Sequence, residues 1–196
     1  GVSKPIKIGT DDFNKIRDEG GYYIDKTVLI GDILEQKKGV YLFTRPRRFG
    51  KSLNLSMLDS YFNLRYADDP DRFADLRISA LRPDDPEKNA YPVIHMSLNG
   101  LKSATYESFL DVLRQKISIV YKNFPELGSS SKQDPDDARQ FLRVKSGEAS
   151  ETELRFSLFD LTRMLEVEYG KRVILLIDEY DNIVNEAAPL DARRSI

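Results

Sequence analysis

The sequence predicts an α/β fold in which a mostly parallel sheet carries helices on both faces. Short apolar runs of the buried-strand type occur at residues 40–43, 92–98 and 173–177. Helical patterns separate these runs, and parallel strands require such crossover connections. With 196 residues, 40% of them hydrophobic and 32% charged, the chain has the composition of a globular protein with its own core.

Two short helices are expected before the first strand. A helical pattern that runs through Ile16 and Arg17 ends at Gly20 and Gly21. The side-chain oxygens of residues 25–27 can cap a second helix, which stops before Gly39. We assign residues 1–39 to an N-terminal helical segment packed on the core, and residues 40–196 to the core itself.

The remaining helices are expected between the strands. Apolar residues recur at helical spacing from 53 to 62 and from 106 to 124. Ser150 and Glu153 form a capping box for a further helix, with Gly170 where a C-terminal cap belongs.

The segments between these elements are rich in charged and turn-forming residues. Residues 125–150 lack a clear apolar face apart from Phe141, Leu142 and Val144, and we expect a mobile insertion there. The charged residues at 82–88 and 134–139 are expected to lie in solvated loops.

Composition excludes several classes of site. Without cysteine, the chain has no disulfide, thiolate metal site or cysteine nucleophile, and its single histidine, His95, cannot build a zinc site alone. Any metal is therefore expected to be a hard, oxygen-bound cation. A net charge of −2 and the lack of a long apolar run predict no membrane partner and a cytoplasmic location.

The first chemical signal follows the first predicted strand. Residues 49–52, Phe-Gly-Lys-Ser, open a helix, where unpaired backbone N–H groups and the positive end of the helix dipole favour phosphate. In the phosphate-loop pattern, Lys51 reaches the terminal phosphates and the Ser52 hydroxyl binds magnesium. Arg45 stands where that pattern has its first glycine, so a plain helix start is the alternative.

The second signal ends the third predicted strand. Asp178 and Glu179 follow five apolar residues, so Asp178 can hold magnesium through water while Glu179 polarises an attacking water. Alone, such a pair also suits a loop cap or a salt bridge. Because ligands bind at the carboxyl ends of strands in α/β sheets, the two signals together predict a nucleotide site.

Four segments carry a family resemblance: 22–27 (Tyr-Tyr-Ile-Asp-Lys-Thr), 45–52 (Arg-Pro-Arg-Arg-Phe-Gly-Lys-Ser), 91–95 (Tyr-Pro-Val-Ile-His) and 177–181 (Ile-Asp-Glu-Tyr-Asp). They resemble the AAA-ATPase-like family of bacterial and archaeal P-loop NTPases, in which the lost first glycine is normal. The resemblance implies a three-layer α/β/α P-loop fold that binds ATP with Mg²⁺, and catalytic roles for Lys51 and Glu179. The implied metal ligands are Ser52 and Asp178. The implied nucleotide-binding residues are Arg45, Pro46, Arg47, Arg48, Phe49, Gly50, Lys51, Ser52 and Leu53.

The resemblance also implies a longer protein. Similar members often continue into a C-terminal domain that resembles restriction nucleases, so we expect this chain to stop before the last strands of its sheet. One of those strands would lie between the phosphate-loop strand and the Asp-Glu strand. We expect Mg-dependent ATP hydrolysis in the complete protein. The alternative is a non-catalytic nucleotide-dependent switch coupled to the C-terminal portion, with self-assembly open and nucleic acid involved only indirectly.

Three groups keep a structural alternative. The loop arginines have two possible roles: contact with phosphate or nucleic acid, or pairing with acidic residues across the site. These arginines are Arg45, Arg47 and Arg48. For the 22–27 segment the two roles are contact with the nucleotide, or burial of a tyrosine together with capping of the next helix. His95, within an apolar strand, is expected to be a satisfied core residue.

Overall fold

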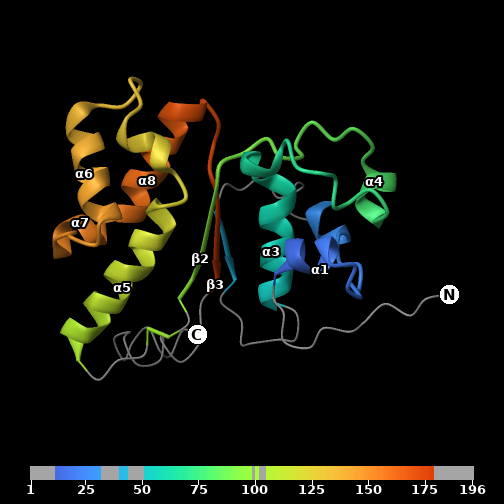
Figure 1. Cartoon of the computed structure of the whole chain (residues 1–196), viewed down its shortest axis with the longest axis horizontal. Coiled ribbons are helices and arrows are strands. Elements are labelled where there is room, and N and C mark those ends of the chain that lie inside the picture. The colour runs from blue at the N-terminus through green and yellow to red at the C-terminus, as the bar shows by residue number, and fades with distance from the viewer. Residues whose placement is uncertain (1–11, 32–39, 44–50, 99, 102–104, 179–196) are drawn as a thin grey trace. The chain divides into compact units, whose positions relative to one another are not determined.

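The computed structural model of the chain describes residues 12–31, 40–43, 51–98, 100–101 and 105–178 (Figure 1). Its strands are β1 (Val40–Phe43), β2 (Val93–Ser97) and β3 (Ile174–Asp178). Its helices are α1 (Phe13–Asp18), α3 (Lys51–Phe62), α4 (Arg77–Leu81), α5 (Tyr106–Tyr121), α6 (Pro135–Lys145), α7 (Glu151–Arg155) and α8 (Ser157–Tyr169), with short 3₁₀ helices η1 (Leu64–Tyr66) and η2 (Pro125–Gly128). The fold is a mixture of helix and sheet, as the sequence predicts.

The described strands form one sheet in the order β1–β3–β2. Ile174 N donates to Pro92 O at 3.0 Å, and Leu98 N donates to Asp178 O at 2.8 Å. From the first bond to the second, the residue numbers increase along both strands, so β2 and β3 are parallel. The predicted strands are confirmed to within a residue at each end. Within the described residues β1 pairs directly with β3, and no further strand stands between them.

The chain divides into two compact units, and the first contains α1, α3 and α4. An aromatic core joins α1 to α3 in this unit. The Phe13 ring stacks on Phe73 with centroids 4.8 Å apart, and Tyr61 meets Phe73 edge-on at 5.1 Å. All three side chains are buried, so the N-terminal helix is a covered part of this core.

The second unit is a cluster of helices built from α5, α6, α7 and α8 (Figure 1). Buried polar groups tie these helices together. Tyr121 Oη donates to Ser157 O at 2.6 Å, and Gln133 Nε2 donates to Met164 O at 2.8 Å. Because both donors are buried, each needs such a partner, and each finds it on α8.

Residues 125–150, where the sequence shows no clear apolar face apart from Phe141, Leu142 and Val144, form η2 and α6. Phe141 and Val144 are buried, and so is Leu127. The Phe141 ring stacks on Tyr121 of α5 with centroids 5.0 Å apart. The apolar face is short, but tertiary contacts with α5 complete it.

Two local predictions concern helix ends, and both are confirmed. Ser150 and Glu153 form the reciprocal capping box at the start of α7. Gly170 ends α8 in the left-handed conformation, with φ of +61°. The single helix expected between these caps is instead interrupted at Phe156, which separates α7 from α8. Among the helices of the described ranges, none is both long and apolar enough to cross a membrane.

Candidate functional site

The predicted phosphate-binding residues are only partly within the described structure. β1 ends at Phe43 and α3 begins at Lys51, so the chain passes from strand to helix across this motif. Ser52 and Leu53 lie in the first turn of α3 and are partly exposed. The other predicted residues of this loop, Arg45, Pro46, Arg47, Arg48, Phe49 and Gly50, lie outside the described residues.

The first turn of α3 has the properties that phosphate binding requires. The N–H groups of this turn have no intrahelical acceptor, and the aligned peptide dipoles place partial positive charge there. With 12 residues, α3 is long enough for this effect. A phosphate chain is therefore a chemically suitable ligand for the turn that contains Ser52.

Asp178 is the last residue of the central strand. Only 5% of its surface is exposed, and its carbonyl oxygen accepts the hydrogen bond from Leu98 N. β1 lies beside β3, so the strand that precedes α3 neighbours the strand that ends in this carboxylate. Glu179, Tyr180 and Asp181 lie outside the described residues.

The oxygen-bearing side chains of the candidate site suit magnesium better than a metal ion whose ligands all come from the protein. Within the described segments, no group of three or more His, Asp or Glu residues is placed to hold a metal ion. Magnesium usually keeps several waters and binds through one or two carboxylates together with substrate phosphates. The Asp178 carboxylate and the Ser52 hydroxyl are each oxygen donors of the kind that this mode uses.

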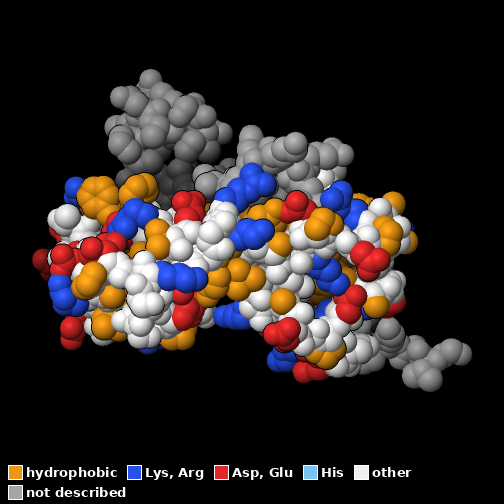
Figure 2. All heavy atoms as spheres, turned by 90° about the horizontal axis from the view of Figure 1, so that it is seen from above, with side chains coloured by type: hydrophobic (Ala, Val, Ile, Leu, Met, Phe, Trp, Pro, Cys, Tyr) orange, Lys and Arg blue, Asp and Glu red, His pale blue; other side chains and the backbone are white. Residues whose placement is uncertain are grey.

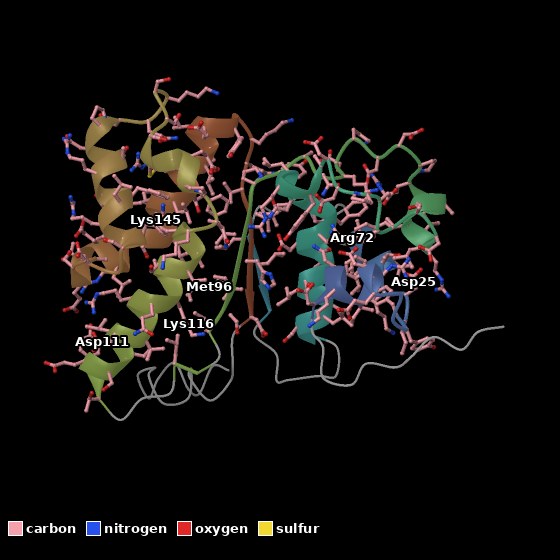
Figure 3. All side chains as sticks on the ribbon, in the orientation of Figure 1. Asp25, Arg72, Met96, Asp111, Lys116 and Lys145 are labelled. Atoms are coloured by element: carbon pink, nitrogen blue, oxygen red, sulfur yellow. The ribbon has the colours of Figure 1, made fainter. Side chains whose placement is uncertain are left out.

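The 22–27 segment has the structural role that the sequence offered as the alternative to nucleotide contact. Asp25 Oδ1 accepts hydrogen bonds from Thr27 N at 2.9 Å and Thr27 Oγ1 at 2.5 Å, while Asp25 Oδ2 accepts from Arg77 N at 2.8 Å. Thr27 Oγ1 in turn accepts from Ile78 N at 3.2 Å. Leu76, the N-cap residue of α4, provides no side-chain cap. Asp25 and Thr27 therefore cap α4 from a distant part of the chain (Figure 3).

The chemistry of this segment agrees with that role. Burial disfavours the charged form of Asp25, but the hydrogen bonds from Thr27 and Arg77 outweigh it and hold the pKa of this carboxyl below its usual range. Tyr23 meets the Phe13 ring edge-on at 5.1 Å, and burial raises the pKa of its phenol to about 12. Tyr22, in contrast, is exposed.

His95 is paired with α3 rather than isolated in an apolar core. Its Nδ1 lies 3.6 Å from Asp59 Oδ2, and Asn63 Nδ2 donates to the other oxygen of Asp59 at 2.9 Å. The His95 side chain is 31% exposed, so the expectation of a satisfied core residue is only partly met. The contact links β2 to α3.

A cavity of about 560 Å³ lies at the opposite end of α3 from Lys51. Ser60 and Tyr61, from the last turn of α3, line it together with charged residues of the segment that follows. These charges pair with one another, as Lys88 Nζ does with Asp71 Oδ1 at 2.7 Å. The helix dipole is negative at this end, which disfavours phosphate, so this cavity does not suit a nucleotide's phosphate chain.

Comparisons with known proteins agree with the sequence resemblance. A family model described as predicted AAA-ATPase matches residues 7–194. An uncharacterized protein from the vnfD 5′ region of Azotobacter chroococcum mcd 1 is 30% identical over 179 residues, which is 91% of this chain and 29% of that protein. The chain thus spans less than a third of this relative's length, and no solved structure matches it. Because one family model covers nearly the entire sequence, the chain belongs to the predicted AAA-ATPases.

Proposed function

We propose that this chain is the ATP-binding P-loop region of a Mg-dependent ATPase. The observation that carries the proposal is the pairing of β1, the strand before the Gly50-Lys51-Ser52 motif, with β3, the strand that ends at Asp178. Because ligands of α/β sheets bind at the carboxyl ends of strands, this pairing supports a site that the two motifs share. Membership of the predicted AAA-ATPases supports the same function.

In this proposal each residue of the site has a defined task. The N–H groups at the start of α3 bind the phosphate chain, and the Lys51 ammonium holds the β- and γ-phosphates. The Ser52 hydroxyl and the Asp178 carboxylate hold magnesium, which when bound neutralises phosphate charge. Glu179 orients and polarises the water for in-line attack. Arg45, Pro46, Arg47, Arg48, Phe49, Gly50 and Leu53 complete the nucleotide-binding segment.

Two substitutions test these roles. Lys51→Ala removes the cation that meets the terminal phosphates, so we expect nucleotide affinity to fall by at least roughly tenfold. Glu179→Gln keeps the size and polarity of the side chain but not its basicity, so we expect binding without turnover in the longer protein. Normal ATP hydrolysis by a Glu179→Gln protein would show that another group activates the water.

The second candidate function is a non-catalytic switch that binds nucleotide and transmits its state to a C-terminal portion. This chain corresponds to 29% of the length of its Azotobacter relative, so a longer protein would have room for such a portion. Absence of turnover in a longer protein that still binds ATP would favour the switch. Self-assembly and a cytoplasmic location remain further proposals.

Direct binding to nucleic acid is a weaker alternative for this chain. Lys and Arg side chains are interspersed with Asp and Glu on the face seen in Figure 2, and the net charge is −2. Binding to a nucleic acid backbone requires clustered positive charge. Salt-dependent DNA binding that is lost when Arg47 and Arg48 are replaced would restore this alternative.

A further inference from the structure

The C-terminal end of α3 is held by a segment almost thirty residues further along the chain. The last carbonyl groups of a helix have no intrahelical donor and need partners from elsewhere. Asn89 supplies them: its backbone N donates to Tyr61 O at 2.7 Å, and its Nδ2 donates to Ser60 O at 2.9 Å and to Asn63 O at 2.8 Å. Both N–H bonds of the side-chain amide are used.

The segment after Asn89 extends this attachment. Tyr91 N donates to Phe62 O at 3.0 Å, and Leu64 N donates to Tyr91 O at 2.8 Å, which forms a parallel bridge between Asn63 and Tyr91. This segment leads directly into β2, which begins at Val93. The backbone bonds of Asn89 and Tyr91 therefore join the end of α3 to the segment that leads into β2.

Asn89 adopts a conformation that few residues tolerate. Its φ is +52°, and among the non-glycine residues of the described ranges only Asp84, at +50°, shares a positive φ. Asparagine tolerates this left-handed region better than most residues. In this conformation both the backbone N–H and the side-chain amide of Asn89 donate to the same helix end.

The other end of α3 is the candidate phosphate-binding turn. A 12-residue α-helix is a stiff rod about 18 Å long, so a change of tilt at Phe62 moves Lys51 and Ser52 at the opposite end. α3 has further polar attachments, among them Phe13 N to Ser56 Oγ at 2.9 Å and, in its last turn, Tyr61 Oη to Asp85 Oδ2 at 2.6 Å. Asn89 adds three hydrogen bonds at this last end of the rod, which help to fix the direction of the helix.

We propose that Asn89 is a positioning residue for the nucleotide site. By clamping the far end of α3, it sets the direction in which the first turn presents Lys51 and Ser52 to the phosphates. The inference rests on the proposed function, because it requires that nucleotide binds at this turn. Misplacement of binding groups by about 1 Å costs roughly a hundredfold in reactions that depend on orientation, so a small tilt has measurable effects.

The test compares two glycine variants of the same chain. Asn89→Gly keeps the left-handed backbone and its N–H but loses both amide bonds to α3. Asp84→Gly relieves the same kind of conformation, and the Asp84 side chain has no bond to α3 in the described structure. The measurement is calorimetric titration with a slowly hydrolysed ATP analogue and Mg²⁺, at a temperature where circular dichroism shows every variant fully folded.

We expect Asn89→Gly to weaken nucleotide affinity roughly tenfold and Asp84→Gly to leave it unchanged. A residue that only stabilises the fold would lower the unfolding temperature without changing the affinity of folded molecules. Asp25→Ala controls for this, because Asp25 accepts hydrogen bonds from Thr27 and from Arg77 N of α4 and none from α3 in the described structure. If Asn89→Gly does not fold, Asn89→Asp, which loses the amide donors but tolerates the same backbone, takes its place.

Two results would overturn the inference in distinguishable ways. Equal affinities for Asn89→Gly, Asp84→Gly and the wild type would show that the clamp does not position the site, while the proposed function would stand. Failure of the folded wild type to bind nucleotide would remove the proposed function and the positioning role with it.

Discussion

Asp25 offers the sharpest test of how the first unit is held together. Its carboxylate caps α4 through Arg77 N and caps the turn at Thr27 through Thr27 N. Loss of a side-chain cap costs about 1 kcal/mol per helix end, and Asp25→Ala removes two such caps. We therefore expect the free energy of unfolding to fall by about 2 kcal/mol, with roughly half that loss for Asp25→Asn, which keeps one acceptor oxygen.

Urea unfolding followed by circular dichroism measures this change. With a denaturant slope of about 2 kcal/mol/M, the midpoint of Asp25→Ala should move down by roughly 1 M. The matched control is Asp68→Ala, because Asp68 is exposed in the same unit and makes no side-chain bond within the described residues. If both variants unfold at the same midpoint, the capping role of Asp25 is refuted. If Asp25→Ala is stable but loses nucleotide affinity, the nucleotide-contact reading of this segment is correct instead.

The pH dependence provides a second check on the same residue. The pKa of Asp25 is lower in the folded chain than its ordinary value of 3.8. Stabilisation from this carboxylate is therefore complete above about pH 3.8 and is lost as the pH falls through the folded pKa. The difference in unfolding free energy between the wild type and Asp25→Ala should shrink in that acidic range, and a constant difference would contradict this account.

Further predictions concern the second unit. Gly170→Ala forces an alanine into φ of +61° and should cost about 1 kcal/mol in urea unfolding, whereas an unchanged midpoint would mean that α8 ends differently. Ser150→Ala removes the capping box of α7, with an expected cost of about 1 kcal/mol by the same assay; equal stability would argue against the box. The hydrogen bond from Arg163 lowers the pKa of Asp137, so in Arg163→Met NMR titration should find the pKa of Asp137 raised, and an unmoved value would exclude the pair.

Features governed by local rules were predictable from the sequence. The strands lie where the sequence has apolar runs between turn-forming residues. Such runs indicate buried strands, because a buried strand does not need to alternate apolar with polar residues. The capping box at Ser150 and the left-handed cap at Gly170 follow from residues three or fewer positions apart. These signals depend on neighbours along the chain and not on tertiary contacts.

Features that depend on distant partners were not predictable. The contact between Asp25 and Arg77 spans 52 residues, and that between Asn89 and Ser60 spans 29. Asp85 is the clearest correction: the segment 82–88 was expected to be a solvated loop, yet this side chain is 1% exposed. It accepts hydrogen bonds from Arg82 Nε at 2.9 Å and Tyr61 Oη at 2.6 Å, which compensate its burial.

For the candidate site, the sequence and the structure contribute different parts. The structure describes the first turn of α3 and the buried Asp178 on the central strand. The loop at 44–50 and Glu179 lie outside the described residues, so their roles stay predictions. The sequence predicts the residues of the candidate site but does not point to Asn89, because the hydrogen bonds of Asn89 to the far end of α3 depend on the fold and not on a local motif.

The central claim is that Lys51 belongs to a nucleotide site at the start of α3. The most direct test is calorimetric titration of the chain with a slowly hydrolysed ATP analogue and Mg²⁺, with Lys51→Ala measured in parallel. We predict saturable binding by the wild type that Lys51→Ala weakens by at least roughly tenfold. Equal binding by the two folded proteins, or none by the wild type, would contradict the claim.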